Sequence, residues 1–364
     1  MLRFLHGGDF HLDSPFHALS PREAAAAREE QRALLSRFAD LSREMEANLV
    51  FLTGDLFDAK RIYPETLEAL QEALASIPAM VFLSPGNHDP YTDQSPYARL
   101  TWPANVHIFE TEEVSAYPLP HLGCTVYGSA FTGPHRHSLP LEGFCAKDEG
   151  LRLGCFHGEV TQGPSRYGAI SPSQIAASGL HYLALGHVHS ASGLQREGSC
   201  YYAYPGCPQG RGFDELGEKG VYLGCLTEGS LTLDFLPLCQ RQYRILEVPL
   251  AGRSPQEALR AALPPTPSGD IVRLLFTGER EEDEAFPESI LHNQAAPYFY
   301  HVTIEDKTEL RSDLWARKRE EGLLGAFLRE MHRRMEAAPP EERHRLALAT
   351  RYGLAALEGR EVPL

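Results

Sequence analysis

The chain has 364 residues, 43% of them hydrophobic, with a mean hydropathy of −0.30 and a formal net charge of −15. No stretch approaches the roughly 18 consecutive apolar residues of a membrane span, and Arg3, His6 and Asp9 interrupt the apolar start that a signal peptide would need. These features exclude a membrane protein and lead us to expect a cytoplasmic location, while the negative charge argues against a broad basic surface for binding DNA.

Five short apolar runs in the first 240 residues predict buried strands. The runs are Leu2 to Leu5, Leu49 to Leu52, Met80 to Leu83, Leu153 to Phe156 and Tyr182 to Leu185. Each ends at glycine or polar residues, and helical segments with recognisable start signals lie between several of them. This alternation indicates a layered α/β fold.

The clearest helix start is the Ser-Pro-Arg-Glu sequence that begins at Ser20. The serine can cap the helix, the proline suits the first helical position, and Glu23 can close a capping box. We expect this helix to run to about Ala47. The same combination of serine, proline and a following Glu or Gln predicts helices after Ser171 and Ser254.

Beyond residue 240 the pattern changes twice. Tyr243 to Leu250 and Ile271 to Phe276 are predicted strands that flank a helix, which indicates a separate small α/β cap. From about Ser312 the chain becomes helical, with apolar residues at spacings of three and four, and a turn at Pro339-Pro340 leads into a final helix. We therefore expect a main domain over residues 1–240, a capping domain over 241–310 and a helical segment over 311–364.

Clusters of metal-type ligands follow all five predicted strands. They are Asp9-Phe10-His11, Gly54 to Asp58, Gly86 to Asp89, His157-Gly158 and Gly186 to His189. Ligands collect at the carboxyl ends of strands in α/β sheets, so these five ends are expected to converge on one pocket. Within Asp9/His11 and within His187/His189, alternate residues of an extended chain would face the same side. Carboxylate, imidazole and amide ligands without thiolates suit a catalytic pair of Mn, Fe or Zn ions.

In this order, the motifs D-x-H, GD-x-x-D, GNHD, HG and GH-x-H resemble those of the calcineurin-like metallophosphoesterases. Gly7 to Asp13, Gly54 to Asp58, Asn87 to Pro90 and Tyr204 to Arg211 are similar to the SbcD and YhaO branch of DNA repair exonucleases. The resemblance is strong over residues 1–240 and looser beyond. It implies a four-layer sandwich of two mixed β-sheets flanked by helices, with the cap and the C-terminal helices added.

The resemblance also implies an activity. It predicts a metal-dependent phosphodiesterase that hydrolyses DNA, as an exonuclease and endonuclease, and serves as the nuclease subunit of an SbcCD-like repair complex. Two divalent ions are implied, with manganese expected and iron, zinc or magnesium as alternatives. Carried over by position, Asp9, His11, Asp55 and His189 hold one ion, and Asp55, Asn87, His157 and His187 hold the other. Such a pair can activate water and neutralise phosphate oxygens.

Three further residues have predicted roles near this pair. His88 matches the catalytic histidine of the family, which is expected to assist the leaving oxygen and not to bind metal. Asp58 departs from relatives that carry histidine there, so a residue that orients a ligand is at least as good an interpretation as a catalytic one. Arg211 can contact a substrate phosphate or make a structural salt bridge.

Other functions stay open at this point. A phosphodiesterase acting on small nucleotides or other phosphoesters would need the same metal motifs. A protein serine/threonine phosphatase fits less well, because those enzymes share GD-x-x-DRG and GNHE whereas Asp58 is followed here by Ala59 and Lys60, and His88 by Asp89. A structural subunit without catalysis is disfavoured because every ligand position is retained.

The net charge leads us to expect a partner that holds DNA, since nonspecific DNA affinity comes mostly from neutralisation of phosphates by Lys and Arg. The resemblance implies an SbcC-like coiled-coil ATPase, and a homodimer formed through the phosphoesterase domain. We expect the ATPase to dock on the final helix and on an apolar stripe made of Leu324, Phe327, Leu328 and Met331. Two helices that pack only on their own domain would show the same pattern.

Overall fold

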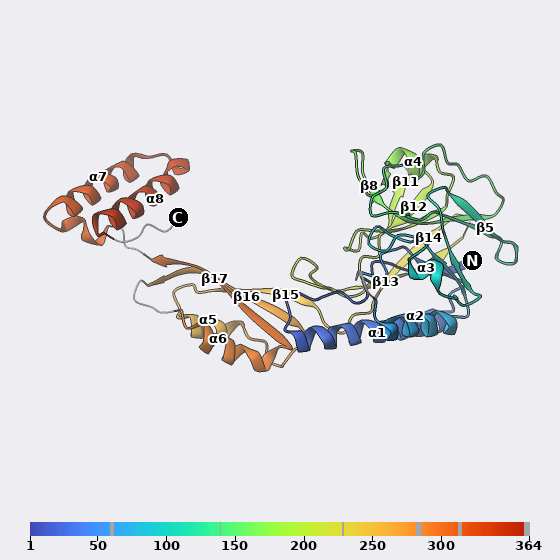
Figure 1. Ribbon diagram of the computed structural model, residues 1–364. Coiled ribbons are helices and arrows are strands. Elements are labelled where there is room, and N and C mark those ends of the chain that lie inside the picture. Colours follow the sequence, from blue (N-terminus) through green and yellow to red (C-terminus); the bar gives the residue numbers. More distant parts are fainter. Residues whose placement is uncertain (59–61, 139, 228, 282–285, 312–314, 360–364) are drawn as a thin grey trace. The chain divides into compact units, whose positions relative to one another are not determined.

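The computed structural model describes residues 1–364 except 59–61, 139, 228, 282–285, 312–314 and 360–364 (Figure 1). Ala59 and Lys60, used above against a protein phosphatase, and the predicted helical start at Ser312 therefore lie outside the described residues. Within the described part of the chain, no helix has both the length and the apolar character needed to cross a membrane.

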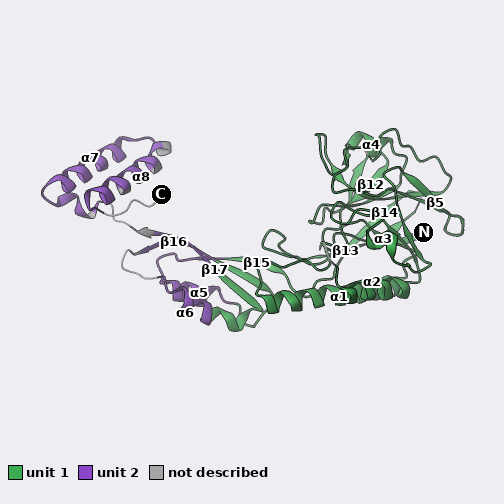
Figure 2. Ribbon diagram, viewed as in Figure 1, with its two compact units in different colours: residues 1–246, 264–274, 294–303 green, residues 247–263, 275–293, 304–364 purple. Residues whose placement is uncertain are grey.

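The described chain forms two compact units (Figure 2). The first contains residues 1–246, 264–274 and 294–303, and the second contains 247–263, 275–293 and 304–364. The units alternate along the sequence, whereas the predicted domains follow one another at residues 240 and 310. That predicted division stays a prediction.

The first unit contains two six-stranded sheets, and all five predicted strands are confirmed within them. In the first sheet β1 to β4 are parallel, while β13 is antiparallel to both β1 and β14. The strand order is β14 (Leu231–Pro237), β13 (Gly220–Leu226), β1 (Leu2–Gly7), β2 (Leu49–Leu52), β3 (Met80–Leu83) and β4 (Val106–Ile108).

The second sheet is also mixed. Strands β12, β10, β7 and β6 are parallel, and the edge strands β11 and β5 are antiparallel to their neighbours. The order is β11 (Gln195–Glu197), β12 (Cys200–Ala203), β10 (Tyr182–Gly186), β7 (Leu151–His157), β6 (Cys124–Gly128) and β5 (Ser115–Leu119). A separate short pair joins β8 (Glu159–Val160) to β9 (Ala169–Ile170).

Alternating side chains of β1 and β2 build two cores, one on each face of the first sheet. Phe4 and Phe51 pack between the two sheets with Tyr182 of β10, whereas Leu5 and Val50 pack beneath the helices α1 and α2. These strands are apolar throughout because both faces are buried. The bounds of these helices are Pro21–Glu44 for α1, Pro64–Ser76 for α2, and Pro96–Arg99 for the short α3.

The outer face of the second sheet is covered by α4 (Pro172–Ala177), whose Ile175 is fully buried. The predicted capping boxes at Ser20 and Ser171 are both formed. Each serine hydroxyl accepts a hydrogen bond from the backbone N–H three residues later, and the serine backbone N–H donates one to the side chain of that residue. The predicted α/β fold, with two mixed sheets flanked by helices, is therefore confirmed.

The two predicted strands after residue 240 and the helix between them are present, together with a further strand and helix that were not predicted. The strands β15 (Tyr243–Pro249), β16 (Ile271–Glu281) and β17 (His301–Arg311) form a three-stranded sheet. Helix α5 (Pro255–Ala262) begins at the predicted capping box of Ser254, and α6 (Glu288–Ala295) precedes β17.

Helices α7 (Leu323–Ala337) and α8 (Pro340–Leu357) form a hairpin in the second unit (Figure 1). Leu328 and Met331 of α7 are buried, and Gly353 of α8 lies so close to Phe327 that a Cβ there would overlap its ring. Part of the predicted apolar stripe therefore packs within the hairpin itself.

Candidate metal centre

The carboxyl ends of five strands bring the predicted ligands together. Asp9 and His11 follow β1, Asp55 follows β2, Asn87 follows β3, His157 is the last residue of β7, and His187 and His189 follow β10. These side chains form two neighbouring groups whose ligand atoms lie close enough together to hold a metal ion. The convergence expected from the strand-end pattern is therefore observed.

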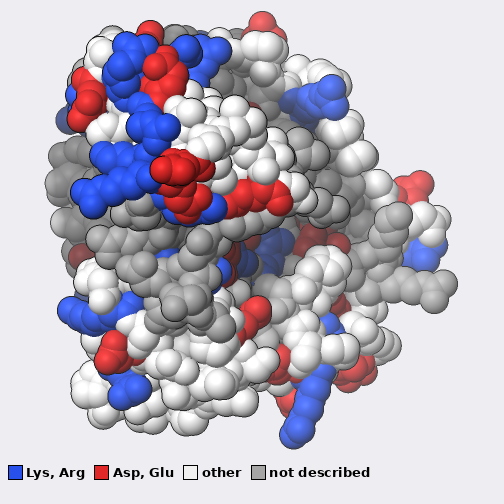
Figure 3. Space-filling model, turned by 90° about the vertical axis from the view of Figure 1, so that its left-hand side faces the viewer, with Lys and Arg blue, Asp and Glu red and all other residues white. Residues whose placement is uncertain are grey.

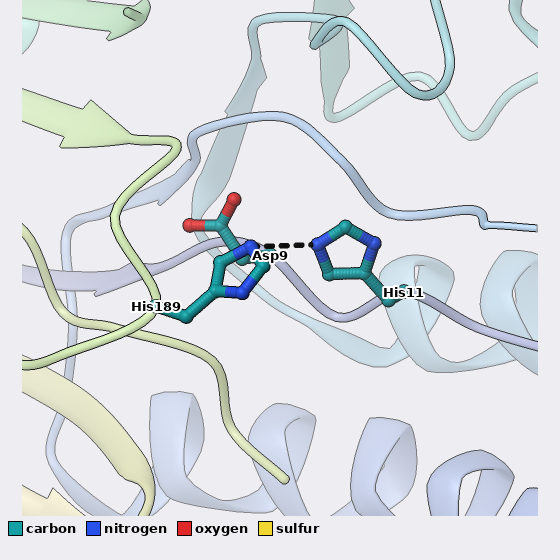
Figure 4. Close-up of side chains that lie close together, drawn as sticks. All are labelled: Asp9, His11 and His189. Atoms are coloured by element: carbon teal, nitrogen blue, oxygen red, sulfur yellow. Dashed lines mark hydrogen bonds between the residues drawn. The ribbon is translucent and has the colours of Figure 1, made fainter. Parts of the chain in front are cut away.

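We call Asp9, His11 and His189 group one (Figure 4). The Nε2 atoms of His11 and His189 face each other at 3.1 Å, with the Asp9 carboxylate beside them. Asp9 and His11 are fully buried, and the Asp9 carboxylate also accepts hydrogen bonds from the backbone N–H of His187.

The donor atoms of group one are arranged for a cation. His189 places its Nδ1 2.7 Å from Oε1 of the Glu215 carboxylate, so the ring proton lies on that side and Nε2 carries a lone pair. Burial lowers the pKa of His11 to about 4, so His11 is neutral at pH 7. Two imidazole nitrogens that meet beside a buried carboxylate are the ligand set that a divalent transition metal prefers.

We call Asp55, Asn87, His157 and His187 group two. The Oδ1 atom of Asn87 lies 3.0 Å from His157 Nε2 and 3.1 Å from His187 Nδ1. His157 donates its Nδ1 proton to the backbone carbonyl of Thr53 at 2.8 Å, so its Nε2 lone pair faces the oxygens of Asn87 and Asp55. Lone pairs facing one another in a buried site need a cation between them, so these residues also fit a metal ion.

The Asp55 carboxylate lies between the two groups. Its Oδ2 atom is 3.4 Å from His157 Nε2 and 3.9 Å from His11 Nε2, and its Oδ1 accepts a hydrogen bond from the backbone N–H of His88 at 2.9 Å. Burial and the proximity of Asp55 raise the pKa of Asp9 well above its ordinary value. Two carboxylates buried side by side need positive charge nearby, which bound divalent ions would supply.

The backbone at the strand ends is not extended. Asp9, His11 and Asp55 have φ angles of 51°, 46° and 48°, and His187 has 105°. Non-glycine residues rarely adopt positive φ, and such conformations concentrate at functional sites. The expectation that Asp9/His11 and His187/His189 would face one side as alternate residues of an extended chain was therefore wrong about the backbone. All four side chains nevertheless face the site. His187 and His189 fall into different groups as a result.

Two glycines allow the loops to approach one another closely. A Cβ on Gly86 would overlap with the Asp55 carboxylate, and a Cβ on Gly186 would overlap with the carbonyl oxygen of Thr53. Any larger residue at either position would push apart the loops that carry the ligands.

His88 lies beside both groups, and with His11 and Asp58 it forms a third cluster of metal-type side chains. Its Nδ1 is 2.9 Å from Asp58 Oδ1, and its ring packs edge-on against His11 with centroids 5.0 Å apart. The hydrogen bond to Asp58 raises the pKa of His88, whose side chain is 45% exposed and so open to a substrate. Asp58 also accepts a hydrogen bond from the Ser14 hydroxyl at 2.6 Å, and its Oδ1 lies 3.7 Å from Nδ1 of the predicted ligand His11, so it is placed to orient both His88 and a ligand.

Arg211 is engaged by two carboxylates. Its guanidinium lies 2.7 Å from Glu215 Oε1 and 3.2 Å from Asp58 Oδ2. These ion pairs match the structural interpretation of Arg211, and contact with a substrate phosphate stays a prediction. Although burial acts in the opposite direction, the hydrogen bonds from His189 and Arg211 hold the pKa of Glu215 below its ordinary value.

Three supporting residues were not predicted from the sequence. Glu215 orients His189, as described above. Asp89 is buried and accepts hydrogen bonds from the Tyr97 hydroxyl and from the backbone N–H groups of Gly86, Asp55, Leu56 and Phe57. Through these hydrogen bonds Asp89 connects the loop after β3 to the loop after β2.

The third supporting residue is Gln31 of α1. Its buried side chain donates hydrogen bonds to the carbonyl oxygens of Phe10 and His11 at 3.2 and 3.1 Å. The sequence signal that could have identified Gln31 is a glutamine on the apolar face of a predicted helix, because a buried polar side chain needs hydrogen-bond partners.

Comparison with known proteins gives one family match. The family described as "calcineurin-like phosphoesterase" matches residues 2–191 of this chain. A curated relative, "uncharacterized metallophosphoesterase YhaO" of Bacillus subtilis (strain 168), is 30% identical over 268 residues, or 67% of this chain. The chain covers 61% of the length of that relative.

Two crystal structures are also similar. A dimetal phosphatase from Danio rerio is 10% identical with a TM-score of 0.42, covering 65% of this chain and 96% of that one. A protein of Thermus thermophilus is 13% identical with a TM-score of 0.39, covering 64% of this chain and 98% of that one.

Proposed function

The chain belongs to the calcineurin-like phosphoesterase family, and from this premise we propose that it is a two-metal-dependent phosphodiesterase whose substrate is DNA. Metal-dependent hydrolysis of phosphoesters follows from the family and from the two groups of metal-type ligands. The observation that carries the proposal of a paired centre is the position of Asp55, whose Oδ2 approaches a histidine of each group.

The chain's own residues have distinct roles in this proposal. Group one would hold one ion and group two the other, with Asp55 available to both. Bound divalent ions supply Lewis-acid stabilisation of phosphate oxygens and a nucleophile at neutral pH. Manganese is the expected metal, and nitrogen and oxygen ligands of this kind also suit iron and zinc.

His88 is proposed as the proton donor to the leaving oxygen. Asp58 holds its Nδ1 at 2.9 Å, which leaves Nε2 as the second ring nitrogen available to the substrate. The hydrogen bond that raises the pKa of His88 favours the protonated ring, which can release a proton to an oxygen as the ester bond breaks.

The choice of DNA is supported by the similarity of the motif sequences to DNA repair exonucleases. The charge distribution favours the alternative of a small nucleotide, because the net charge is −15 and positive and negative side chains are interspersed on the face drawn in Figure 3. A chain with this charge depends on a partner for nonspecific DNA affinity. We therefore keep an SbcC-like ATPase, and a homodimer, as part of the DNA proposal.

A substrate comparison tests the proposal. The purified chain would be supplied with Mn²⁺ and assayed on single-stranded DNA, double-stranded DNA, cyclic dinucleotides and a phosphopeptide, beside the variant Asp55→Asn. We expect hydrolysis of DNA by the parent and none by the variant. Hydrolysis of cyclic dinucleotides alone would favour the small-nucleotide alternative, and hydrolysis of the phosphopeptide alone would contradict both.

A further inference from the structure

A cavity of about 430 Å³ adjoins the candidate metal centre within the first unit. Its lining comes from the loops 14–18 and 211–215, together with Asp58 and Arg273 of β16. Asp58 belongs both to this lining and to the hydrogen bond with His88. A substrate positioned at His88 would therefore extend directly into the cavity.

The arginine Arg211 in the lining of the cavity is already paired with carboxylates. Arg211 makes ion pairs with Asp58 and Glu215, and Ser14 donates its hydroxyl proton to Asp58. The whole lining contains two arginines and three carboxylates, the third being that of the exposed Asp214, so it carries one more negative than positive side chain. This excess disfavours a second phosphate group and favours a ligand without negative charge that has hydrogen-bonding edges.

The wall formed by Phe213 is flat and firmly supported. Arg273 lies over the Phe213 ring with Cζ 4.2 Å from the centroid, and Tyr243 packs edge-on against the same ring with centroids 5.2 Å apart. Aromatic rings and guanidinium planes are the surfaces on which nucleobases stack in proteins that bind unpaired nucleotides. Phe213 is only half-buried, so its remaining surface is available to a ligand.

The loop 14–18 is fixed in shape. Phe16 is 2% exposed and has a φ of 51°, a strained conformation that persists only where the surrounding structure holds it. Cavities of roughly 300–1,000 Å³ bind small organic ligands, so this one has room for a base with its sugar. The cavity therefore combines a suitable size, an aromatic side chain and a polar lining without excess positive charge.

We propose that this cavity binds one nucleoside unit of the substrate, with the base against Phe213 and Arg273 and the scissile phosphate at the metal centre. The inference rests on the proposed phosphodiesterase function and adds a source of substrate selectivity. It predicts that a diester carrying a nucleoside is preferred over a diester without one, and that this preference depends on the aromatic wall.

Two synthetic diesters separate nucleoside binding from chemistry. The p-nitrophenyl ester of thymidine 5′-monophosphate carries a nucleoside, whereas bis(p-nitrophenyl) phosphate does not. Phe213→Leu and Arg273→Gln should each lower kcat/KM for the thymidine ester by about 5- to 100-fold, mainly through KM, as expected from loss of one stacked base. The loss on bis(p-nitrophenyl) phosphate should be much smaller, so the ratio of kcat/KM for the two diesters measures the contribution of the nucleoside.

Matched controls come from a second arginine–aromatic pair outside the cavity. The guanidinium of Arg196 lies 5.0 Å from the Tyr201 ring centroid, and neither residue lines the cavity. Arg196→Gln and Tyr201→Leu should leave both substrates unaffected. Melting temperatures of all four variants establish that each remains folded. If a folded Phe213 or Arg273 variant then lost activity equally on both diesters, the result would count against the proposal.

A binding measurement on EDTA-treated protein makes the test independent of catalysis. Saturation-transfer NMR with free thymidine should show transfer from the parent and from both control variants, and a clear loss with Phe213→Leu. Equal transfer to all proteins would overturn the nucleoside site. If the parent hydrolyses neither diester with Mn²⁺, the proposed function fails, while the NMR result still decides whether the cavity takes a nucleoside.

Discussion

The two ligand groups meet at Asp55 but are held in place by different kinds of partner. In group one, His189 is oriented by the Glu215 carboxylate, which is in turn paired with Arg211. In group two, His157 is oriented by the backbone carbonyl of Thr53. Group one thus depends on ionised side chains that single substitutions can remove, whereas group two depends on the integrity of the strands that carry it.

The supporting layers differ in the same way. Behind group two, His6 of β1 places its Nδ1 2.8 Å from the Tyr182 hydroxyl and its Nε2 3.4 Å from the Thr53 hydroxyl, entirely between the sheets. Beside group one, Asp58 and Arg211 reach the lining of the cavity. Group two is therefore embedded in the core, and group one is connected to the surface on which we expect the substrate.

The largest effect is expected where the two groups meet. Asp55→Asn should remove metal from both groups and abolish hydrolysis, because its carboxylate lies between them. Metal content measured by mass spectrometry after dialysis would test this, with the exposed Asp93→Asn as the control. A variant that keeps one full equivalent of metal would show that the groups are independent.

A large loss of rate without loss of metal is expected at His88. His88→Ala removes the proposed proton donor, so kcat should fall roughly 10²- to 10⁴-fold while metal content stays at the parent level. The exposed His121→Ala serves as the control. If His88→Ala hydrolyses diesters like the parent, His88 has no role in proton transfer.

The contrast between the groups is tested most directly at Glu215. Glu215→Gln removes the carboxylate behind His189, so the affinity of group one for Mn²⁺ should fall about 10- to 100-fold while group two is unaffected. Calorimetric titration of the EDTA-treated protein measures both sites, and His189→Ala identifies the phase that belongs to group one. The exposed Glu218→Gln, from the same loop, should change neither phase. If Glu215→Gln weakened Mn²⁺ binding in both phases equally, the two groups would not differ in what supports them.

The support of group two predicts a pH effect on folding. Burial lowers the pKa of His6 from 6.5 to about 3, so the unfolded chain binds this proton more readily than the folded one. The contribution of His6 to stability is fully present above pH 6.5 and is lost as the pH falls from 6.5 toward 3, by about 2 kcal/mol at pH 5.

His6→Gln should flatten this part of the dependence. Urea unfolding of the metal-free protein between pH 5 and pH 8 measures it, and His121→Gln should retain the parent slope. An unchanged slope in His6→Gln would show that other buried histidines account for the acid sensitivity.

The smallest effect on either group is expected from the helical hairpin. Deletion of residues 312–364 should leave metal content and hydrolysis of single-stranded DNA unchanged, while it abolishes capture of an SbcC-like ATPase in a pull-down assay. Capture with undiminished affinity would place the docking surface elsewhere. Loss of metal would show that the second unit supports the metal centre.

Much of the fold could be predicted from local sequence because the signals are local. The capping boxes at Ser20, Ser171 and Ser254 need only residues three positions apart, and each helix begins where its box predicts. The strand-end clusters likewise placed all seven ligand candidates at one edge of the fold, since strand direction alone determines which ends meet.

The tertiary structure decided what supports those residues. Spacing alone does not separate His187 from His189, although the family resemblance implied that they hold different ions; in the structure they lie in different groups, with a left-handed backbone at His187. Glu215 meets His189 from 26 residues away along the chain, and Gln31 meets the loop after β1 from a helix. Such contacts depend on packing in three dimensions, and no spacing rule predicts them.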